Sequence, residues 1–175
     1  MPDVKRTTVI LEKKDEEFLQ DLISQGKEAG IKNFIGKMFD VYRNLAMYDW
    51  KFPGEYYYGI SRVAFVVQEV LEALTLYVPP EKAVEAGKKM GESLRFSALK
   101  GRSEPFSEKT TKELLTKARL LGLADFGLEG DKAFVKNPIL SNANLLRGFM
   151  EGFLSCKCET LTERSPFLFK LGTRG

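Results

Sequence analysis

The chain has 175 residues, 43% of them hydrophobic, which is enough for one ordinary domain or two small ones. It contains no histidine, no phosphate-binding glycine loop and no nucleophile motif, so we expect neither enzymatic activity nor a cofactor. The formal net charge is +3, but residues 1–50 hold eight Lys and Arg against nine Asp and Glu. No apolar run reaches the roughly 18 residues of a membrane span and no secretory signal is recognisable, so we expect a cytoplasmic protein with no membrane partner.

The N-terminal residues predict a strand followed by two amphipathic helices. Residues 5–11 are rich in β-branched side chains and free of glycine and proline. Apolar residues at helical spacing then predict one helix up to a glycine-containing turn, and a second helix from an N-cap at Asn33 to Trp50. A lone strand and two wide apolar stripes make a poor monomer, whereas two copies would pair their strands and share one core. We therefore expect a homodimer built on residues 1–52.

This pattern resembles the ribbon-helix-helix family, as in the CopG- and Arc-like repressors, over residues 4–50. The resemblance implies that the outward face of the paired strands enters the major groove of double-stranded DNA and that the start of the second helix holds phosphates. The DNA-contacting residues that it implies are Lys5, Arg6, Thr8, Ile10, Lys32 and Asn33. Ile10 stands where the family has a polar residue. Either Ile10 contacts a thymine methyl group, or this ribbon binds DNA with little sequence specificity.

Residues 55–175 predict a helix-rich α+β domain with short antiparallel strands. The expected elements are a helix over 60–78, a helix after Pro80, a helix with a capping box at Thr110 and Glu113 and a stop at Gly122, a hairpin over 123–135, a helix opened by Ser141 or Asn142, and strands over 156–163 and 167–171.

Two tracts of this domain, 87–91 and 147–153, carry pairs of glycines four residues apart. Residues 60–171 are similar to the 4-vinyl-reductase-like domain, whose members act as small-molecule sensors in bacterial activators. The resemblance implies a domain that stabilises the dimer and binds a small apolar ligand. The pocket residues expected for such a ligand, which equally fit a plain core, are Tyr77, Arg95, Phe96, Arg147, Phe149 and Phe153. The paired cysteines of the family are missing, so a zinc or redox role that depends on them is not carried over.

The two cysteines, Cys156 and Cys158, are separated by one residue. Residues at that spacing on a strand point to opposite faces, so we expect two reduced thiols and no disulfide between them. A symmetric dimer would bring four such thiols within reach of zinc or copper(I), which leaves a metal site as an alternative to the ordinary pair of thiols.

Two other hypotheses for the function remain open. DNA could instead contact a winged-helix-like segment over residues 110–135. Lys109 precedes this segment, and the basic residues Lys112, Lys117 and Arg119 lie within it. The chain could also be a dimeric scaffold or a ligand-binding protein that does not bind DNA, and the missing basic excess of residues 1–50 fits that hypothesis.

Overall fold

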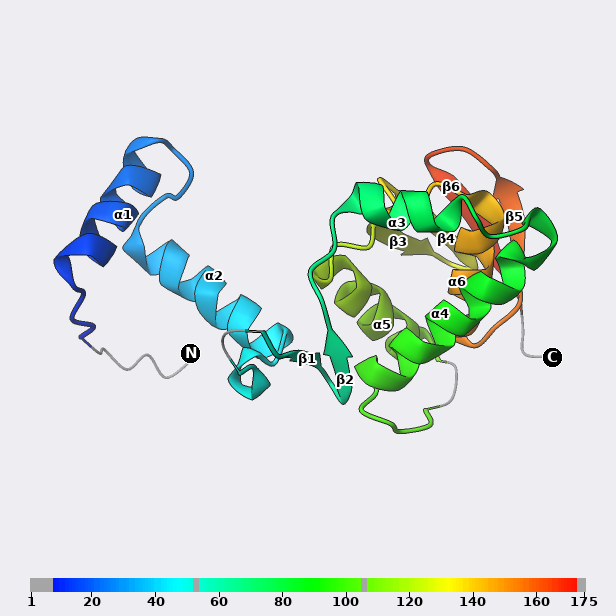
Figure 1. The fold of residues 1–175 in the computed structure, drawn as a ribbon, viewed down its shortest axis with the longest axis horizontal. Helices are drawn as coiled ribbons and strands as arrows, with labels where there is room; N and C mark the ends of the chain where they lie inside the picture. Colours follow the sequence, from blue (N-terminus) through cyan, green and yellow to red (C-terminus); the bar gives the residue numbers. More distant parts are fainter. Residues whose placement is uncertain (1–7, 52–53, 105–106, 173–175) are drawn as a thin grey trace. The chain divides into compact units, whose positions relative to one another are not determined.

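Figure 1 shows the fold in a computed structural model that describes residues 8–51, 54–104 and 107–172. The described residues form six α-helices, two short 3-10 helices and two antiparallel sheets, so the fold class is α+β. Close contacts divide the chain into two compact units, residues 1–43 and 44–175.

The N-terminal unit contains the two expected helices, α1 (Lys13–Ser24) and α2 (Ile31–Asn44). α1 begins after Glu12, and its first turn carries Asp15 and Glu16, whose negative charges are favourable at a helix N-terminus. The amphipathic spacing of apolar residues therefore identified both helices correctly.

Three details of this unit differ from the prediction. α2 begins at Ile31, so Asn33 lies inside its first turn and is not the N-cap. α2 also ends at Asn44, well before Trp50, because Ala46 takes a left-handed conformation (φ +50°) that stops a helix. Residues 8–12, the described part of the expected strand, form no strand in the single chain. A strand forms only where a second segment shares its backbone hydrogen bonds.

The expected helix over residues 60–78 is wrong in its first part. There the chain forms a hairpin of β1 (Tyr56–Tyr58) and β2 (Ser61–Val63), and α3 spans only Gln68–Thr75. Gly59, with a φ of +62°, takes the first position of the two-residue turn, a place that favours glycine. The tyrosines on one side of the turn and Val63 on the other prefer extended backbone, which outweighs the helix-like spacing of the apolar residues.

An aromatic cluster attaches residues 44–51 to this hairpin. After the 3-10 helix η1 (Met47–Asp49), Trp50 packs edge-on against Tyr56 and Phe65, with ring centroids 5.0 and 5.8 Å away. The Trp50 Nε1–H donates a 2.8 Å hydrogen bond to the Tyr57 carbonyl. These contacts explain why the second unit begins at residue 44, earlier than the boundary near residue 52 that the sequence predicted.

The next helices begin with recognisable capping signals. The 3-10 helix η2 (Pro80–Lys82) starts at a proline and leads directly into α4 (Ala83–Ala98). Further along, α6 (Ala143–Leu154) is capped by Asn142, whose side chain accepts a 3.0 Å hydrogen bond from the Leu145 N–H. The sequence predicted both helix starts.

The cap of α5 (Glu108–Leu120) lies three residues earlier than predicted. Ser107 is the N-cap, and its hydroxyl accepts a 3.1 Å hydrogen bond from the Thr110 N–H. The capping box expected at Thr110 and Glu113 is therefore wrong, because both residues lie within the helix. The predicted stop is confirmed, since Gly122 follows the helix with a φ of +73°.

The larger sheet has four antiparallel strands in the order β3-β4-β6-β5. Its strands are β3 (Asp125–Glu129), β4 (Lys132–Lys136), β5 (Cys158–Thr162) and β6 (Phe167–Leu171). Alternate residues of the two central strands are buried, namely Ala133, Val135, Phe167, Phe169 and Leu171. This buried face shares one hydrophobic core with α5 and α6.

α4 packs against α6 with the two backbones in contact. A Cβ atom at any of four positions would collide with a backbone carbonyl oxygen of the facing helix, and these positions are Gly87, Gly91, Gly148 and Gly152. The glycines that the sequence singled out thus serve a close helix–helix approach.

Candidate functional site

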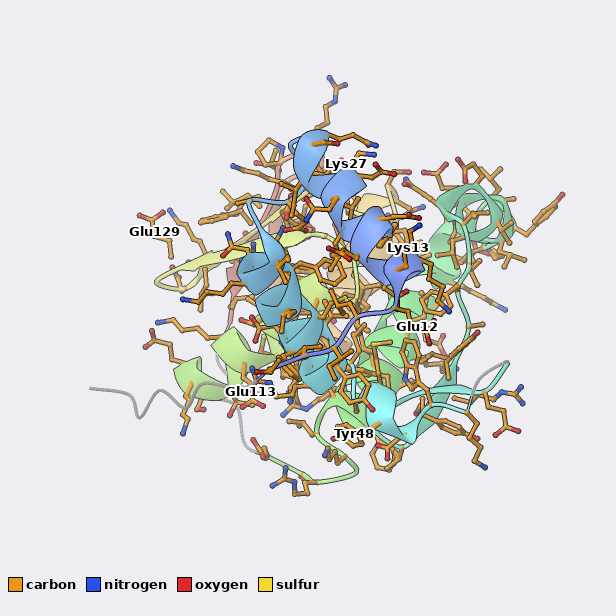
Figure 2. The ribbon with its side chains drawn as sticks, turned by 90° about the vertical axis from the view of Figure 1, so that its left-hand side faces the viewer. Glu12, Lys13, Lys27, Tyr48, Glu113 and Glu129 are labelled. Atoms are coloured by element: carbon orange, nitrogen blue, oxygen red, sulfur yellow. The ribbon has the colours of Figure 1, made fainter. Side chains whose placement is uncertain are left out.

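The two helices of the N-terminal unit leave most of their apolar surface uncovered. Leu19 is the one buried residue in the described part of this unit, residues 8–43. The exposed large apolar side chains are Val9, Ile10, Phe18, Ile31, Met38, Phe39, Val41 and Tyr42. Figure 2 shows side chains projecting from both helices, with Lys13 and Lys27 near the two ends of α1. Helices this apolar are stable in water only when another surface covers them.

The predicted ribbon lies at the start of this unit. Lys5 and Arg6 lie outside the described residues. Thr8 and Ile10 are exposed, and the Ile10 side chain is 94% exposed. Val9, on the other face of the alternation, is also more than half exposed, so neither face of this segment is covered by the single chain.

Lys32 and Asn33 lie together in the first turn of α2, and both are exposed. This turn contains no acidic residue. The Gly30 carbonyl accepts the Phe34 N–H at 3.1 Å, so the N–H groups of the three residues between them have no acceptor within the helix. This helix end and the Lys32 ammonium group together favour an anion such as a phosphate.

The alternative DNA-binding segment is built into the second unit. Within α5, Lys112 pairs with Glu108 at 2.6 Å, and Lys117 pairs with Glu113 and donates to the Ala98 carbonyl. The hairpin that follows is half of the four-stranded sheet, with β4 paired on both sides. A winged helix needs a hairpin free to reach the DNA, so this arrangement disfavours that alternative.

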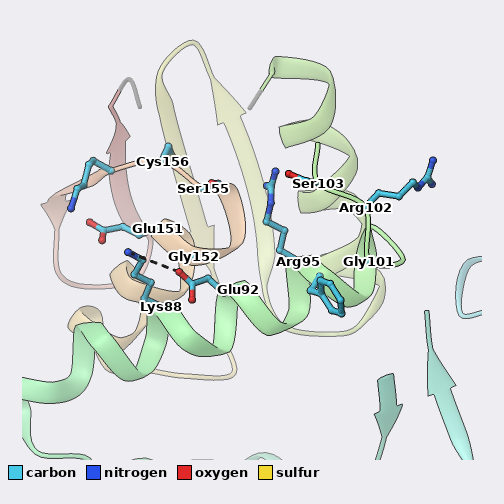
Figure 3. Close-up of a pocket in the computed structure, with 12 residues that line it drawn as sticks. Lys88, Glu92, Arg95, Gly101, Arg102, Ser103, Glu151, Gly152, Ser155 and Cys156 are labelled. Atoms are coloured by element: carbon cyan, nitrogen blue, oxygen red, sulfur yellow. Dashed lines mark ion pairs between the residues drawn. The ribbon is translucent and has the colours of Figure 1, made fainter. Parts of the chain in front are cut away.

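A cavity of about 460 Å³ opens beside the C-terminal parts of α4 and α6 (Figure 3). The loop at residues 101–103 and the chain leaving α6 complete its walls. Its charged lining residues are Lys88, Glu92, Arg95, Arg102, Glu151 and Lys157. Polar walls of this kind suit a polar or charged small molecule better than an apolar one.

Arg95 holds the walls of this cavity together. Its guanidinium donates to the carbonyls of Phe153 at 3.0 Å and Glu104 at 2.6 Å, and thus joins α4, the end of α6 and the adjoining loop. Figure 3 shows the side chain pointing towards Ser103. Phe96 also lines the cavity. The structure thus brings together two of the six residues expected in a ligand pocket.

The other four expected pocket residues lie elsewhere. Phe149 and Phe153 are stacked in the core at a centroid distance of 5.3 Å. Tyr77 is 86% exposed. Arg147 is half-buried, and its Nε has no hydrogen-bond partner among the described residues.

The two cysteines are free and buried. The expectation that both lie on one strand is wrong, because Ser155 ends α6 with a φ of +57° and β5 begins only at Cys158, so Cys156 is not on the strand. The Cys158 thiol donates a hydrogen bond to Cys156, which lowers the pKa of Cys156, and Arg95 adds to this effect. The same bond, with burial, raises the pKa of Cys158. Glu151 accepts the Cys158 N–H at 3.2 Å.

A second hollow, of about 480 Å³, lies between the β1–β2 hairpin and α4. Its apolar walls come from Tyr58, Val63, Met90 and Leu94, and its polar lining residues are Ser61, Lys89, Ser93 and Ser97. Sequence reasoning missed this hollow because it assigned the second strand of the hairpin to a helix.

The segment around α3 carries a second uncovered apolar surface. Leu71 and Val78 pack against the buried residues Ala83, Leu140 and Leu145. The exposed apolar side chains of this segment are Phe65, Val66, Val67, Val70, Leu74, Leu76 and Tyr77. We call these seven residues the α3 patch. A concentration of exposed apolar side chains in one segment is typical of interaction sites in soluble proteins.

No helix in the described part of the chain is both long and apolar enough to cross a membrane. Residues 8–51, 54–104 and 107–172 also bring together no group of three or more Cys, Asp or Glu side chains that could hold a metal ion. Comparison of the chain with protein-family models, with curated proteins and with solved structures gives no match, so its function has to be argued from its own geometry.

Proposed function

We propose that the chain is a homodimeric, sequence-specific DNA-binding transcription regulator. The observation that carries the proposal is the N-terminal unit, in which two helices have a single buried side chain between residues 8 and 43. With the strand that the sequence predicts over residues 5–11, the order strand, helix, turn, helix would be that of a ribbon-helix-helix module. We infer that two copies pair residues 5–11 as an antiparallel ribbon and bury the apolar stripes of α1 and α2 against each other.

Burial of these stripes gives a second copy a clear energetic role. Phe39 is 60% exposed and Phe18 57% exposed in the single chain. Fully burying one such side chain contributes about 1.5–3 kcal/mol, so a few of them offset the entropy lost when two chains associate. In the second unit the α3 patch supplies further apolar surface that would stabilise the same dimer.

The DNA-facing side of the proposed dimer is the outward face of the ribbon. Arg6, Thr8 and Ile10 alternate onto that face, where Arg6 would read guanine and Ile10 would meet a thymine methyl group. Lys32, Asn33 and the N–H groups at the start of α2 would bind the flanking phosphates. The acidic residues of α1 lie on the helix that faces away from DNA in this arrangement, which reconciles the neutral charge of residues 1–50 with DNA binding.

The second unit would act as the sensor. A small apolar ligand fits the hollow beside α4, where Val63, Met90 and Leu94 offer apolar contacts and Ser93 and Ser97 offer hydroxyls. Ligand binding would change DNA affinity by favouring one arrangement of the dimer. A library of apolar small molecules should contain some that raise the melting temperature of the wild type but not of a Leu94→Asp variant; the absence of any such compound would remove the sensor role.

The DNA-binding proposal is tested by capture of sheared genomic DNA. We expect wild-type protein to enrich discrete fragments and the Arg6→Ala, Thr8→Ala variant to lose them, while both retain the mass of a dimer. Lys136→Ala, Lys170→Ala provides a matched control, because these exposed lysines lie on the sheet of the second unit. We expect this control to enrich the same fragments as the wild type.

The other outcomes of the capture experiment point elsewhere. Enrichment that survives loss of Arg6 and Thr8 but disappears in Lys109→Glu, Lys112→Glu would assign DNA binding to α5. A dimer that enriches nothing at low salt would be a scaffold or ligand-binding protein, since DNA binding through phosphates strengthens as salt is lowered.

A further inference from the structure

We propose that Cys156 and Cys158 form a dithiol that a small hydroperoxide oxidises to an intramolecular disulfide. The hydroperoxide enters the cavity beside α4 and α6, reacts at Cys156, and Cys158 then closes the disulfide. This site is independent of the proposed DNA binding.

The first support is the mutual position of the two thiols. Only Lys157 separates the two cysteines, and both backbone N–H groups donate to Glu151: that of Cys156 to its carbonyl at 3.3 Å and that of Cys158 to its carboxylate at 3.2 Å. The chain bends at Ser155, and β5 begins at Cys158. The Glu151 carboxylate accepts the Cys158 N–H and fixes the start of the strand relative to α6. A disulfide between these residues would close a short loop at the end of α6.

The second support is the difference in access between the two thiols. Cys156 contributes to the wall of the cavity of about 460 Å³, whereas Cys158 is not among the lining residues. Both residues are otherwise buried, with exposures of 6% and 7%. A small neutral oxidant such as hydrogen peroxide fits this volume. Cys156 is therefore the thiol that meets the oxidant.

The third support is the charge distribution around Cys156. Interaction with Cys158 and, to a smaller extent, the guanidinium of Arg95 favour the thiolate form of Cys156, which is the nucleophile, while burial and Glu151 oppose them. The pKa of Cys156 is accordingly lowered. Burial and the bond to Cys156 keep Cys158 protonated, with a contribution from Glu151 and an opposing one from Arg147.

The chemistry balances with the hydroperoxide as the oxidant. The Cys156 thiolate attacks the O–O bond, forms an S–O bond and releases hydroxide or alkoxide, which gives a sulfenic acid at Cys156. The sulfur atom of Cys158 then attacks the Cys156 sulfur and expels water, with its proton passing to the leaving oxygen. Two thiols are oxidised by two electrons, and one hydroperoxide is reduced to water or to an alcohol and water. An external dithiol returns the pair to its reduced form.

The test uses the full chain with hydrogen peroxide as the probe and intact mass as the readout. We expect the wild type to lose the mass of two hydrogen atoms, with recovery after dithiothreitol. In Cys158→Ser the reaction should stop at a sulfenic acid that dimedone traps at Cys156. In Cys156→Ser we expect no oxidation at the same peroxide dose.

A measurement on the wild type alone guards against variants that fail to fold. Iodoacetamide added at a limiting amount to the native protein should label Cys156 before Cys158, and labelling in urea should remove this preference. The proposal is overturned if peroxide leaves both thiols intact, if Cys158 is labelled or oxidised first, or if the product is a disulfide between two chains.

Discussion

The four glycines between α4 and α6 have no room for a side chain, because each lies against a backbone carbonyl oxygen that cannot swing aside. Gly36 offers a contrast, since it lies in α2 with nothing within 4 Å of the position that a Cβ would take. On helical spacing it also lies opposite the apolar stripe of α2. The two sites therefore allow the same substitution to be compared in a tight contact and in open space.

We expect Gly148→Ala to lower the free energy of unfolding by about 3 kcal/mol, at the upper end of the range for overpacking. Gly36→Ala should be neutral or stabilising by up to about 1 kcal/mol, because alanine loses less backbone entropy than glycine in a helix. Urea unfolding followed by circular dichroism measures both. Equal effects of the two substitutions would contradict the close approach of α4 and α6.

The hydroxyl group of Tyr58 should affect how the stability of the protein depends on pH. It is buried and has no hydrogen-bond partner within the described part of the chain. Burial raises the pKa of Tyr58 to about 12, and the Glu113 carboxylate adds to the effect. The hydroxyl of Tyr58 therefore stays protonated in the folded protein at pH values at which the unfolded chain, with the usual tyrosine pKa of about 10, has already lost this proton.

Stability should consequently fall as the pH rises from about 10 to about 12, by at most about 1.4 kcal/mol per pH unit from this group. Tyr58→Phe should reduce that loss, and at pH 7 it should be neutral or stabilising by about 1 kcal/mol, because an unpaired buried hydroxyl is removed. Tyr77→Phe, at an exposed position, is the control. Parallel pH profiles of the wild type and Tyr58→Phe would show that the hydroxyl is not buried as described.

At the scale of elements, α5 is the clearest example of a local signal that was placed wrongly. Ser107 and Thr110 both have side chains suited to a cap, and the sequence offers Glu113 as the partner of the later one. The helix starts from the earlier residue, since the Ser107 hydroxyl accepts the Thr110 N–H.

Ser107→Ala should lower the free energy of unfolding by about 1 kcal/mol through loss of this cap. Ser103→Ala changes an exposed loop serine and should have little effect. Thermal unfolding of the two variants beside the wild type provides the comparison. Unchanged stability in Ser107→Ala would favour a helix that starts at Thr110.

Elements with an unambiguous period were predictable, whereas ambiguous ones were not. α1, α2 and the strands of the larger sheet follow from spacing and turn residues such as Gly122 and Gly130. The β1–β2 hairpin was missed because Ile60 and Val63 fit a helix face as well as a strand. Only the packing against α4 and the turn at Gly59 decide between the two.

The candidate site was harder to predict than the elements, because it depends on distant segments. Cys156 lies off the strand because the chain takes a left-handed conformation at Ser155, which no spacing rule indicates. The cavity exists because Arg95 holds the loop carbonyl of Glu104 and the end of α6 at the same time. The sequence did single out Arg95, but as a ligand contact and not as the residue that joins the walls.

At the scale of the whole molecule, the uncovered apolar surfaces predict a dimer. We expect sedimentation equilibrium to give twice the chain mass for the wild type and for Asn44→Asp. Phe39→Asp introduces the same charge into the apolar stripe of α2 and should shift the equilibrium towards the monomer, because a buried unpaired carboxylate is strongly unfavourable. A Phe39→Asp protein that remains fully dimeric would show that the second unit alone holds the dimer.

The most direct test of the central claim is the affinity of the protein for one captured DNA fragment, measured by fluorescence anisotropy over a series of salt concentrations. We expect the Arg6→Ala, Thr8→Ala dimer to bind this fragment at least about tenfold more weakly than the wild type at equal salt, since a good base contact contributes roughly 1–3 kcal/mol. Lys136→Ala, Lys170→Ala should bind as the wild type does. Equal affinity of the ribbon variant and the wild type would contradict DNA recognition by the N-terminal ribbon.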